Sequence, residues 1–421
     1  ENSNHPHYST LKEDELPINL QQYEDQYVLR ISDWSCNSVR DQVMLSAKEL
    51  DISIWEVANT HKFMDLQVSE SEGIALLSML KDKKVSDEDF KMEMMIDDLP
   101  QRIFETYPFN TASEDGDIKS NAEIFFRQYR DINVIYNWFD LLVETYPHLL
   151  TVEWIGQTYE GRDIKALRLT AHQENSKGIK TIAITGGIHA REWVSVSTAC
   201  YVLYQFLLDY EAGDPKAIFY LKNMDFLFLP VMNPDGYSET WGTNRLWRKN
   251  KQETYNPRCQ GIDIDHNFNF HFTRSMDSPC GENYPGEGAF ESLESYAWDK
   301  YLNETKHDHP IHGYLDLHSY AEEVLYPYAF TCGELPRDEE NLLELAYGLS
   351  QSIRLTSGKN YGVLSACEDK NSDLMPSMGA GSALDYMYHN KAYWAFVLKL
   401  RDSGSHGFLL PSKFIVPVGN E

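Results

Sequence analysis

Between residue 122 and the C-terminus, short apolar runs alternate with longer segments that have the period of an amphipathic helix. The expected strands cover 181–187, 226–232 and 311–318, and the expected helices cover 133–146 and 192–210. Strands that alternate with helices of about 15 residues pack as a mostly parallel sheet that is covered on both sides. The sequence therefore predicts an α/β fold with a mixed, mostly parallel central sheet and helices on both faces.

The N-terminal part has a separate pattern, which predicts a small α/β domain at residues 20–98 after a tail at 1–19. Its expected strands cover 27–31, 63–68 and 91–96, and its expected helices cover 36–50 and 70–80. The segment 99–121 is polar and has no apolar period, so we expect an exposed linker that a trypsin-like protease could cut at Arg102 or Lys119. The larger domain would then cover 122–421.

The composition restricts the possible partners. The 421 residues include 37 Lys and Arg against 65 Asp and Glu, which gives a net charge of −28. Such a surface repels phosphate backbones and anionic lipids. The longest apolar run, 226–232, is far shorter than the roughly 20 residues of a membrane helix. We therefore expect a soluble, monomeric protein with no nucleic acid and no membrane among its partners.

The spacing of the cysteines suits two local disulfides. Cys259 and Cys280 enclose one loop-rich stretch, and Cys332 and Cys367 enclose another. No pair of cysteines has the spacing of a cysteine zinc site.

The other two cysteines and the start of the chain bear on its compartment. Cys200 lies in an apolar helical pattern and is expected to be a buried thiol, whereas Cys36 has no obvious partner. The chain opens at Glu1 without a methionine or an apolar leader, as it would after removal of a signal peptide. Together with the expected disulfides, this predicts a secreted, extracellular protein.

The residues that indicate chemistry begin where the strand at 181–187 ends. The following turn reads Gly-Gly-Ile-His189-Ala-Arg-Glu192-Trp, and a histidine and a carboxylate with this spacing can reach one metal ion. Open α/β sheets place their sites at such carboxyl ends of strands. A catalytic zinc needs a third protein ligand, and His318 at the end of the strand at 311–318 is the best candidate. A single histidine and glutamate with this spacing are more often ordinary polar residues, so the pattern alone leaves both a zinc site and that simpler interpretation open.

Several further segments follow this turn or precede it in a fixed order. They are Thr158–Arg162, Pro230–Gly236, Asn244–Lys249, His318–Tyr320 with Tyr326–Tyr328, and Leu400–Asp402 with Gly407–Pro411. With the turn at 189–193, they resemble the zinc metallocarboxypeptidases of the pancreatic carboxypeptidase A and B type over nearly the whole chain. The resemblance implies that residues 20–98 are an inhibitory pro-segment and that the chain is a proenzyme. It also places disulfides at the two cysteine pairs.

The resemblance assigns roles to individual residues. His189, Glu192 and His318 would bind one Zn²⁺ per chain, and Asp263 would hold a ligand histidine through a hydrogen bond. Arg248 would polarise the carbonyl of the scissile peptide and stabilise the oxyanion.

The resemblance also implies where a substrate, the C-terminus of a peptide or protein, would bind. The implied secondary binding positions are Arg191, Ser319, Tyr320 and Phe408. Leu384, with Val397 nearby, matches the floor of the specificity pocket. An apolar floor suits a hydrophobic C-terminal residue.

Three functional features, which involve four positions, differ from the family pattern. The general-base glutamate is replaced by Lys399, and an ammonium cannot take a proton from a zinc-bound water and adds repulsion toward the metal. The Asn-Arg pair that binds the substrate carboxylate is replaced by Asp265 and His266, of which the first repels a carboxylate and the second is largely neutral at pH 7. The tyrosine that closes over the substrate is absent from 368–384, and Met375 or a neighbour would take its place.

Three functions agree with these residues. The first is a secreted, zymogen-like homologue that keeps zinc, has little or no peptidase activity, and binds a peptide end or a larger protein partner. The second is an active zinc exopeptidase that removes C-terminal residues, hydrophobic ones if the family pocket is used. With His266 and Lys399 as a new clamp, its substrate would instead be acidic or lack a free carboxylate, and a neutral Lys399 could serve as the base. The third is a structural or storage protein that does not need zinc. The three differences from the family pattern favour the first function, a homologue with little or no peptidase activity.

Overall fold

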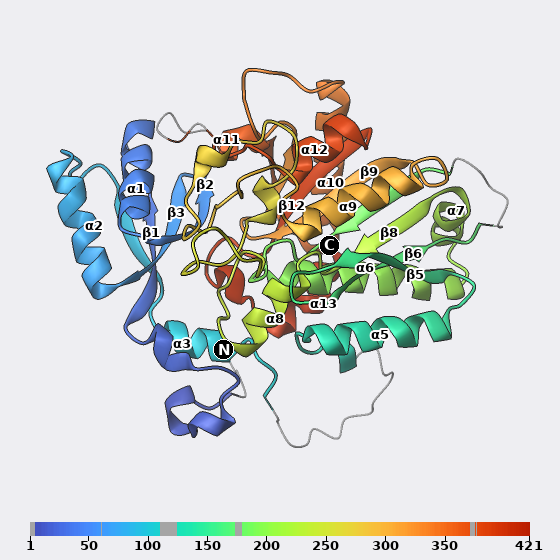
Figure 1. Ribbon diagram of the computed structural model, residues 1–421, viewed down its shortest axis with the longest axis horizontal. Coiled ribbons are helices and arrows are strands. Elements are labelled where there is room, and N and C mark those ends of the chain that lie inside the picture. Colours follow the sequence, from blue (N-terminus) through green and yellow to red (C-terminus); the bar gives the residue numbers. More distant parts are fainter. Residues whose placement is uncertain (1–4, 60, 110–123, 173–178, 371–374, 376) are drawn as a thin grey trace.

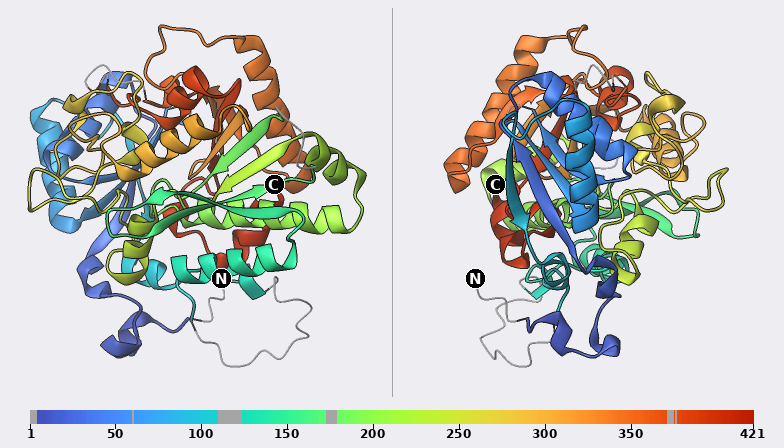
Figure 2. Two further views of the ribbon diagram at one scale, coloured as in Figure 1. Left: turned by 45° about the vertical axis from the view of Figure 1, so that its right-hand side comes forward. Right: turned by 90° about the vertical axis from the view of Figure 1, so that its left-hand side faces the viewer.

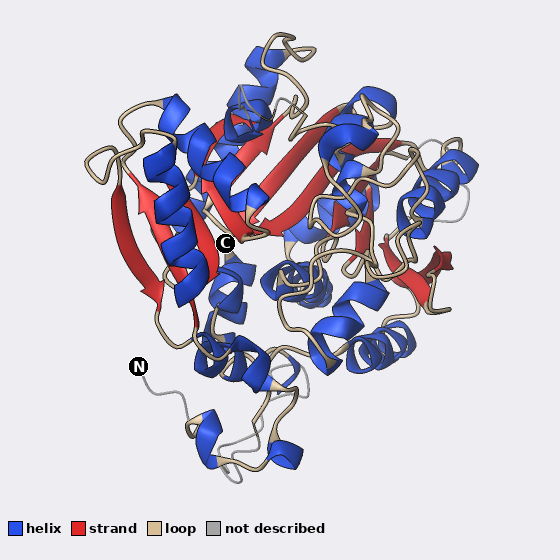
Figure 3. Ribbon diagram, turned by 60° about the vertical axis from the view of Figure 1, so that its left-hand side comes forward, coloured by secondary structure: helices blue, strands red, loops and turns tan. Residues whose placement is uncertain are grey.

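The computed structural model describes residues 5–59, 61–109, 124–172, 179–370, 375 and 377–421. Its strands form two sheets, one of four strands near the N-terminus and one of eight strands in the rest of the chain (Figure 1). The two sheets lie apart from each other (Figure 3). We call residues 20–98 the N-terminal unit and the described residues from 124 onward the large unit.

The N-terminal unit is an antiparallel sheet in the order β2-β3-β1-β4 with two helices on one face. Short 3₁₀ turns at Tyr8–Thr10, Glu13–Glu15 and Leu20–Tyr23 precede β1 (Gln26–Ser32), α1 (Asn37–Glu49), β2 (Ser53–Ala58), β3 (Phe63–Ser69), α2 (Glu70–Asp82) and β4 (Lys91–Ile96). Sequence patterns did not predict β2. Its last four residues are all buried, because Val57 packs under α1 and α2 while Trp55 and Ala58 pack against the large unit, so the strand lacks a polar face.

The expected linker at 99–121 begins with a helix. Helix α3 (Leu99–Phe104) is capped by the side chain of Asp98 and buries Ile103 in the main core, so the expectation of an exposed polar segment is wrong for these residues. Pro100 indicated a break in the sequence, but it stands in the first turn, where a proline costs no backbone hydrogen bond. Residues 110–123 lie outside the described residues, and the linker remains a prediction there.

Limited trypsin digestion is expected to cut the intact chain first at Lys119 and to leave a stable fragment of roughly 300 residues. Arg102 is a poor site because it lies within α3 beside the buried Ile103, so cleavage there requires the helix to unfold. Mass spectrometry of the earliest fragments would identify the bond, and Lys119→Gln should delay the first cut. First cuts clustered inside 130–400 would contradict the division into two units.

The large unit is built on a sheet in the order β11-β10-β12-β9-β7-β8-β6-β5. The strands are β5 (Leu150–Gln157), β6 (Asp163–Leu169), β7 (Thr181–Thr185), β8 (Asp225–Leu229), β9 (Ile311–Ser319), β10 (Glu323–Tyr326), β11 (Gly362–Ser365) and β12 (Trp394–Leu400). The pairs β10–β11, β12–β9, β9–β7 and β7–β8 are parallel, whereas β10–β12, β6–β8 and β5–β6 are antiparallel. The sheet is therefore mixed and mostly parallel, as predicted.

Helices cover both faces of this sheet, as expected (Figure 2). They are α5 (Ile132–Thr145), α6 (Trp193–Glu211), α7 (Pro215–Asn223), α8 (Pro234–Gly242), α9 (Leu293–Thr305), α10 (Glu339–Ser357), α11 (Ala366–Lys370), α12 (Ala383–Asn390) and α13 (Ile415–Asn420). Phe226 and Phe228 of β8 join the core formed with α5, α6 and α13, and the alternate residues Leu227 and Leu229 join the core formed with α9, α10 and α12. This alternation across a fully buried strand explains its purely apolar sequence.

The N-terminal unit packs its sheet against the large unit, with α1 and α2 on the outer side (Figure 1). In β3, Met64 and Leu66 belong to the core under α1 and α2, whereas Phe63 belongs to the core shared with the large unit. Because side chains alternate along a strand, one face of β2 and β3 packs under α1 and α2, and the other face packs against the large unit.

Both expected disulfides, Cys259–Cys280 and Cys332–Cys367, are present. Cys200 is a buried thiol in α6, as expected, and Cys36 is an exposed thiol. Among the described residues, no helix combines the length and the apolar character needed to cross a membrane.

Candidate metal centre

Three potential ligands converge at the carboxyl ends of two neighbouring strands. Strands β7 and β9 are parallel partners, so the turn after β7, with His189 and Glu192, lies beside His318 near the end of β9. One ligand atom from each of the three residues lies within 4.8 Å of the other two, and all three side chains are buried. The register of the sheet therefore brings together the three potential metal ligands that the sequence pattern pointed to.

The two histidines present the same ring nitrogen to Glu192. His189 Nδ1 lies 2.6 Å from one carboxylate oxygen of Glu192, and His318 Nδ1 lies 3.0 Å from the other. Each Nε2 faces a second carboxylate, at 3.1 Å from Asp263 Oδ1 and 2.8 Å from Asp316 Oδ2. With a metal bound, each Nε2 would donate its proton to Asp263 or Asp316, and the lone pair of each Nδ1 would be directed at the metal together with Glu192. Two imidazoles and one carboxylate are a donor set that fits zinc with an open position.

Asp316 was not identified from the sequence. It lies two residues before His318 in β9, and its other oxygen accepts a hydrogen bond of 2.7 Å from the Thr185 hydroxyl. The signal was the spacing itself, because residues i and i+2 of a strand point to the same face. Asp316 therefore orients His318 as Asp263 orients His189.

Asp263 also fixes Arg248. The guanidinium donates to Asp263 Oδ2 from Nε at 3.2 Å and from Nη2 at 3.0 Å. Burial alone would raise the pKa of Asp263, but Arg248 and the neighbouring histidines hold that pKa well below its ordinary value. The carboxylate is thus ionised and joins the arginine to a ligand histidine.

The loop that carries Arg248 and Asp263 is linked through Asn250 to the buried carboxyl group of Glu294. Asn250 accepts a hydrogen bond from the Ile262 amide at 2.8 Å and donates to Glu294 Oε2 at 2.8 Å. Glu294 is 1 % exposed, and burial raises its pKa to about 7 against the hydrogen bond from Asn250. The pKa of this carboxyl is higher in the folded protein, at about 7, than the 4.5 of the unfolded chain. Its contribution to stability is therefore fully present below pH 4.5 and is lost as the pH rises through about 7.

Glu294→Gln is expected to increase the free energy of unfolding by about 2–3 kcal/mol at pH 8 and by less than about 1 kcal/mol at pH 5. The glutamine keeps an acceptor for Asn250 but carries no charge to bury. Urea unfolding at both pH values measures the difference. The control is Glu304→Gln at the exposed end of the same helix, which should change neither value. An equal effect of Glu294→Gln at pH 5 and pH 8 would contradict the proposed cause.

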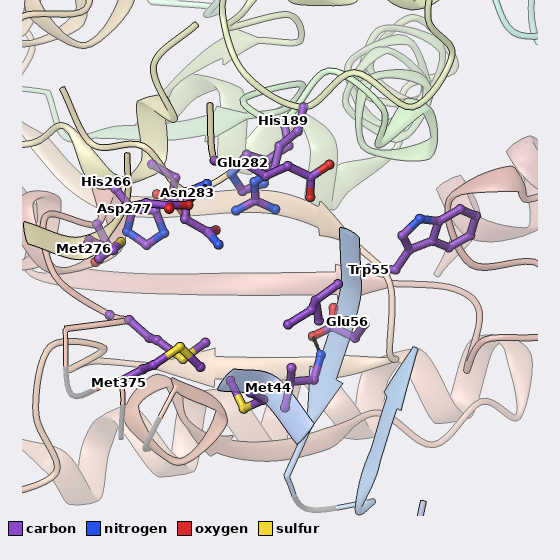
Figure 4. A pocket seen from close by; sticks show the side chains of 18 of the residues that line it. Met44, Trp55, Glu56, His189, His266, Met276, Asp277, Glu282, Asn283 and Met375 are labelled. Atoms are coloured by element: carbon purple, nitrogen blue, oxygen red, sulfur yellow. Dashed lines mark hydrogen bonds between the residues drawn. The ribbon is translucent and has the colours of Figure 1, made fainter. Parts of the chain in front are cut away.

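Lys399 lies in β12 beside His318 in the register of the sheet, and its side chain is only 8 % exposed. Its Nζ donates to Glu56 Oε1 at 2.8 Å and to Asp369 Oδ2, and it lies 3.8 Å from Glu323 Oε2 (Figure 4 shows Glu56 in the pocket). Burial acts to lower the pKa of Lys399, but the three carboxylates hold it well above its ordinary value. The charge of Lys399 is therefore compensated by carboxylates, and the raised pKa does not favour the alternative of a neutral lysine acting as base. The weakening of zinc binding by this cation stays a prediction.

The two residues at the clamp positions are also held within the protein. Asp265 Oδ1 accepts a hydrogen bond of 3.0 Å from the Ala383 amide at the start of α12. His266 Nδ1 donates to the Ala380 carbonyl at 2.9 Å, and burial lowers the pKa of His266 against the nearby Asp263 and Asp265. The histidine is thus a neutral structural group, and the alternative in which it forms a new carboxylate clamp with Lys399 is not supported.

A comparison with known proteins decides the family. The model of the zinc carboxypeptidase family matches residues 135–421. The chain belongs to the zinc carboxypeptidase family. It is 49 % identical over 374 residues to the inactive metallocarboxypeptidase ECM14 of Saccharomyces cerevisiae, which covers 88 % of this chain and 83 % of that protein. It is 38 % identical over 446 aligned positions to the protein of the same name from Blastomyces gilchristii, which covers all of this chain and 73 % of that protein.

Solved structures with this fold agree with the family. The thrombin activatable fibrinolysis inhibitor has a TM-score of 0.78 at 25 % identity and covers 94 % of this chain and 95 % of its own. The carboxypeptidase A of Helicoverpa armigera has a TM-score of 0.79 at 25 % identity and covers 94 % of both chains. The resemblance stated from motifs is therefore confirmed.

The cleft that a carboxypeptidase substrate would enter is present as a cavity of about 1020 Å³ between the two units. The large unit contributes the three potential metal ligands, Arg248, and the apolar pair Leu384 and Val397 at the predicted pocket floor. The N-terminal unit contributes Met44, Leu45, Lys48 and residues 51–57, and Figure 4 labels Met44, Trp55 and Glu56 among the lining side chains. The N-terminal unit therefore forms one wall of the site.

Most of the predicted secondary substrate positions contact other parts of the protein. Arg191 donates to Glu282 at 3.1 Å and to Ser53 of β2 at 3.4 Å, and its guanidinium lies 4.5 Å from the ring centre of Phe408. Ser319 lies on the cavity wall, and its amide donates to the ligand Glu192 at 2.8 Å.

Tyr320 is completely buried, and its hydroxyl donates to Asp65 of β3. Phe408 packs on Trp55 of β2 with ring centres 5.1 Å apart. Sequence reasoning missed these partners on β2 and β3, because residues hundreds of positions apart leave no local pattern.

Proposed function

We propose that this chain is a non-catalytic carboxypeptidase homologue that holds zinc and acts by binding. The observation that carries the proposal is the position of Lys399, whose ammonium is bound by Glu56 and Asp369 with Glu323 nearby. A general base needs a lone pair close to neutral pH, and a lysine with a strongly raised pKa has none. The relatives named inactive metallocarboxypeptidase agree with this reading.

The clamp positions support the same conclusion. A substrate carboxylate would meet the negative charge of Asp265 and a His266 that is already bonded to a backbone carbonyl. Arg248 stays cationic, but two of its nitrogens are bound to Asp263. A free peptide C-terminus therefore lacks the bidentate cation that would orient its scissile bond.

The same site fits a metal. His189, Glu192 and His318 would hold Zn²⁺, and a bound zinc acts as a Lewis acid toward an oxygen atom in its open position. Asp263 and Asp316 keep the two imidazoles in the tautomer that binds. Lys399 stands in the place of the base that would take a proton from the attacking water, and its ammonium has no lone pair to offer.

The purified protein is expected to contain about one zinc per chain, and zinc should stabilise it by about 3 kcal/mol at 100-fold excess over its Kd. Elemental analysis and thermal unfolding with and without chelator measure both quantities. His318→Ala should lose the zinc, whereas His312→Ala on the same strand should keep it. Well under one zinc per chain in protein purified without chelator would contradict this part of the proposal and favour a purely structural role.

Peptidase activity is the direct test of the proposal. The intact chain and the chain cut in its linker would be incubated with peptides that end in hydrophobic, basic, acidic or amidated residues. We expect turnover at least about 10²–10⁴-fold below that of an active family member such as the Helicoverpa armigera carboxypeptidase A. Ordinary peptidase rates in the cut protein would show that the chain is an exopeptidase instead.

The binding role implies a partner and a place. We propose a secreted monomer whose partner is a peptide end or a larger protein, since the disulfides favour an oxidising compartment and the cavity has the size of a ligand site.

A further inference from the structure

The face of the large unit around Lys399 is covered by β2 and β3. Glu56 of β2 binds the Lys399 ammonium at 2.8 Å, and Asp65 of β3 accepts a hydrogen bond from Tyr320. We propose that this face is a lasting binding surface for the N-terminal unit, with Lys399 as its central anchor, so that the unit stays bound after the linker is cut. The residue that removed the catalytic base would then be the one that holds the N-terminal unit in place.

The ion pair at Lys399 is shielded from water. The exposed fractions of the side chains are 8 % for Lys399, 9 % for Glu56 and zero for both Asp369 and Glu323. A charge pair that is removed from solvent is screened little by salt, and truncation of one partner at a buried interface weakens binding strongly. This contact therefore differs from the exposed pairs at the surface of the N-terminal unit, such as the pair of Lys83 and Glu49.

A second buried polar contact lies one strand further. Asp65 is completely buried and receives two hydrogen bonds from Arg30, at 2.7 and 2.8 Å, besides the one from Tyr320. Arg30 also donates to the backbone carbonyl of Ser403 in the large unit at 2.8 Å. Separation of the units would break the contacts of Asp65 with Tyr320 and of Arg30 with Ser403, whereas the pair of Arg30 and Asp65 would stay together in the N-terminal unit.

Apolar packing joins the same surfaces. Trp55 stacks near Phe408 in the large unit, and Trp55, Phe63, Tyr320 and Phe408 belong to one continuous core. Lasting interfaces resemble a core that has been divided in two, whereas transient ones are more polar. The surface around Lys399 combines both features, a shared core and satisfied buried charges.

Residue 399 decides whether the charges at this contact attract or repel the N-terminal unit. A glutamate, which the family carries there, would stand among Glu56, Asp369 and Glu323 and would add a fourth negative charge. A lysine neutralises part of that charge and attracts Glu56 across the boundary. Loss of catalysis and retention of the N-terminal unit are thus two consequences of one residue.

The experiment cuts the full chain at Lys119 and follows the two fragments by size-exclusion chromatography and by dilution. Wild-type fragments are expected to co-elute. Glu56→Gln should raise the dissociation constant by about 10- to 100-fold, and Glu56→Lys should release the N-terminal fragment. The control Glu49→Gln removes a carboxylate from an exposed pair within the N-terminal unit and should stay within twofold of wild type.

Exchange of the two charges between positions 56 and 399 shows whether weaker binding comes from the lost ion pair or from misfolding of the variant. Glu56→Lys combined with Lys399→Glu should bind at least tenfold more tightly than Glu56→Lys alone, because the attraction is restored in reverse. Fragments of the wild type that separate on cutting, a Glu56→Gln variant that matches Glu49→Gln, or an exchange without rescue would each overturn the proposal. The peptide assay does not enter this test, so its outcome and that of the proposed function can be told apart.

Discussion

Restoring the three family residues, with Lys399→Glu, His266→Arg and Asp265→Asn in one chain, is expected to raise peptide hydrolysis by about 10²–10⁴-fold over the wild type. The glutamate supplies the base that takes a proton, and the Asn-Arg pair supplies a cation that binds the terminal carboxylate in bidentate fashion. Asp265→Asn keeps the side-chain acceptor for the Ala383 amide, so α12 should keep its start. The preferred substrate should end in a hydrophobic residue, because Leu384 and Val397 line the cavity.

The gain should exceed the product of the separate gains, because base and clamp act on one transition state. Lys399→Glu alone should change hydrolysis little, since the substrate would still be poorly oriented. It should also loosen the N-terminal unit, because the new carboxylate faces Glu56 and Asp369. Hydrolysis is therefore measured on the chain cut in its linker, where that loosening opens the cleft.

Lys391→Glu serves as the control for charge reversal, because Lys391 pairs with Asp299 away from the cavity. It should leave hydrolysis at the level of the wild type. A triple variant that folds and binds zinc, yet stays inert toward peptides with hydrophobic ends, would show that positions 265, 266 and 399 are not the cause of inactivity.

Lys399→Met is expected to lower the free energy of unfolding of the intact chain by about 3–5 kcal/mol at pH 7. Methionine has nearly the same length but no charge, so it leaves Glu56, Asp369 and Glu323 close together without the cation between them. Attraction in the buried group becomes repulsion. The effect is large because these side chains are at most 9 % exposed, so solvent screens their charges weakly.

Urea unfolding of the variant and the wild type measures this loss. The matched control is Lys83→Met, which breaks a half-exposed pair with Glu49 and should cost less than about 1 kcal/mol. An equal effect of the two substitutions would mean that the carboxylates around position 399 do not depend on the lysine.

Strands β7, β8 and β9 and helices α5 and α6 of the large unit could be predicted from the sequence because each carries a local apolar pattern, whereas the other strands and helices of that unit were not predicted. The run from Phe226 to Leu229 is apolar because β8 is buried on both faces, and that condition is visible in consecutive residues. The same holds for His189 and Glu192, whose spacing places them on one turn, and for His318 at the end of its strand. Motifs of this kind also sufficed to recognise the family.

Two local features of the fold were hidden by their surroundings. Strand β2 packs against a core on each side, so its sequence lacks the alternation by which a strand is recognised. Helix α3 is short and begins with Pro100, a residue that marks a break in most other contexts. In both cases tertiary packing outweighed the local signal.

The sequence by itself determined that the metal ligands are kept and that the base and the clamp are replaced, because these are identities at single positions. Only the tertiary structure decided what the replacements do. Lys399 meets Glu56 across 343 positions of sequence, and Tyr320 meets Asp65 across 255. No period or spacing records a contact of that range, because it arises when the N-terminal unit packs against the large unit. The charge of Lys399 is therefore fixed by sequence, and its partners are fixed by the fold.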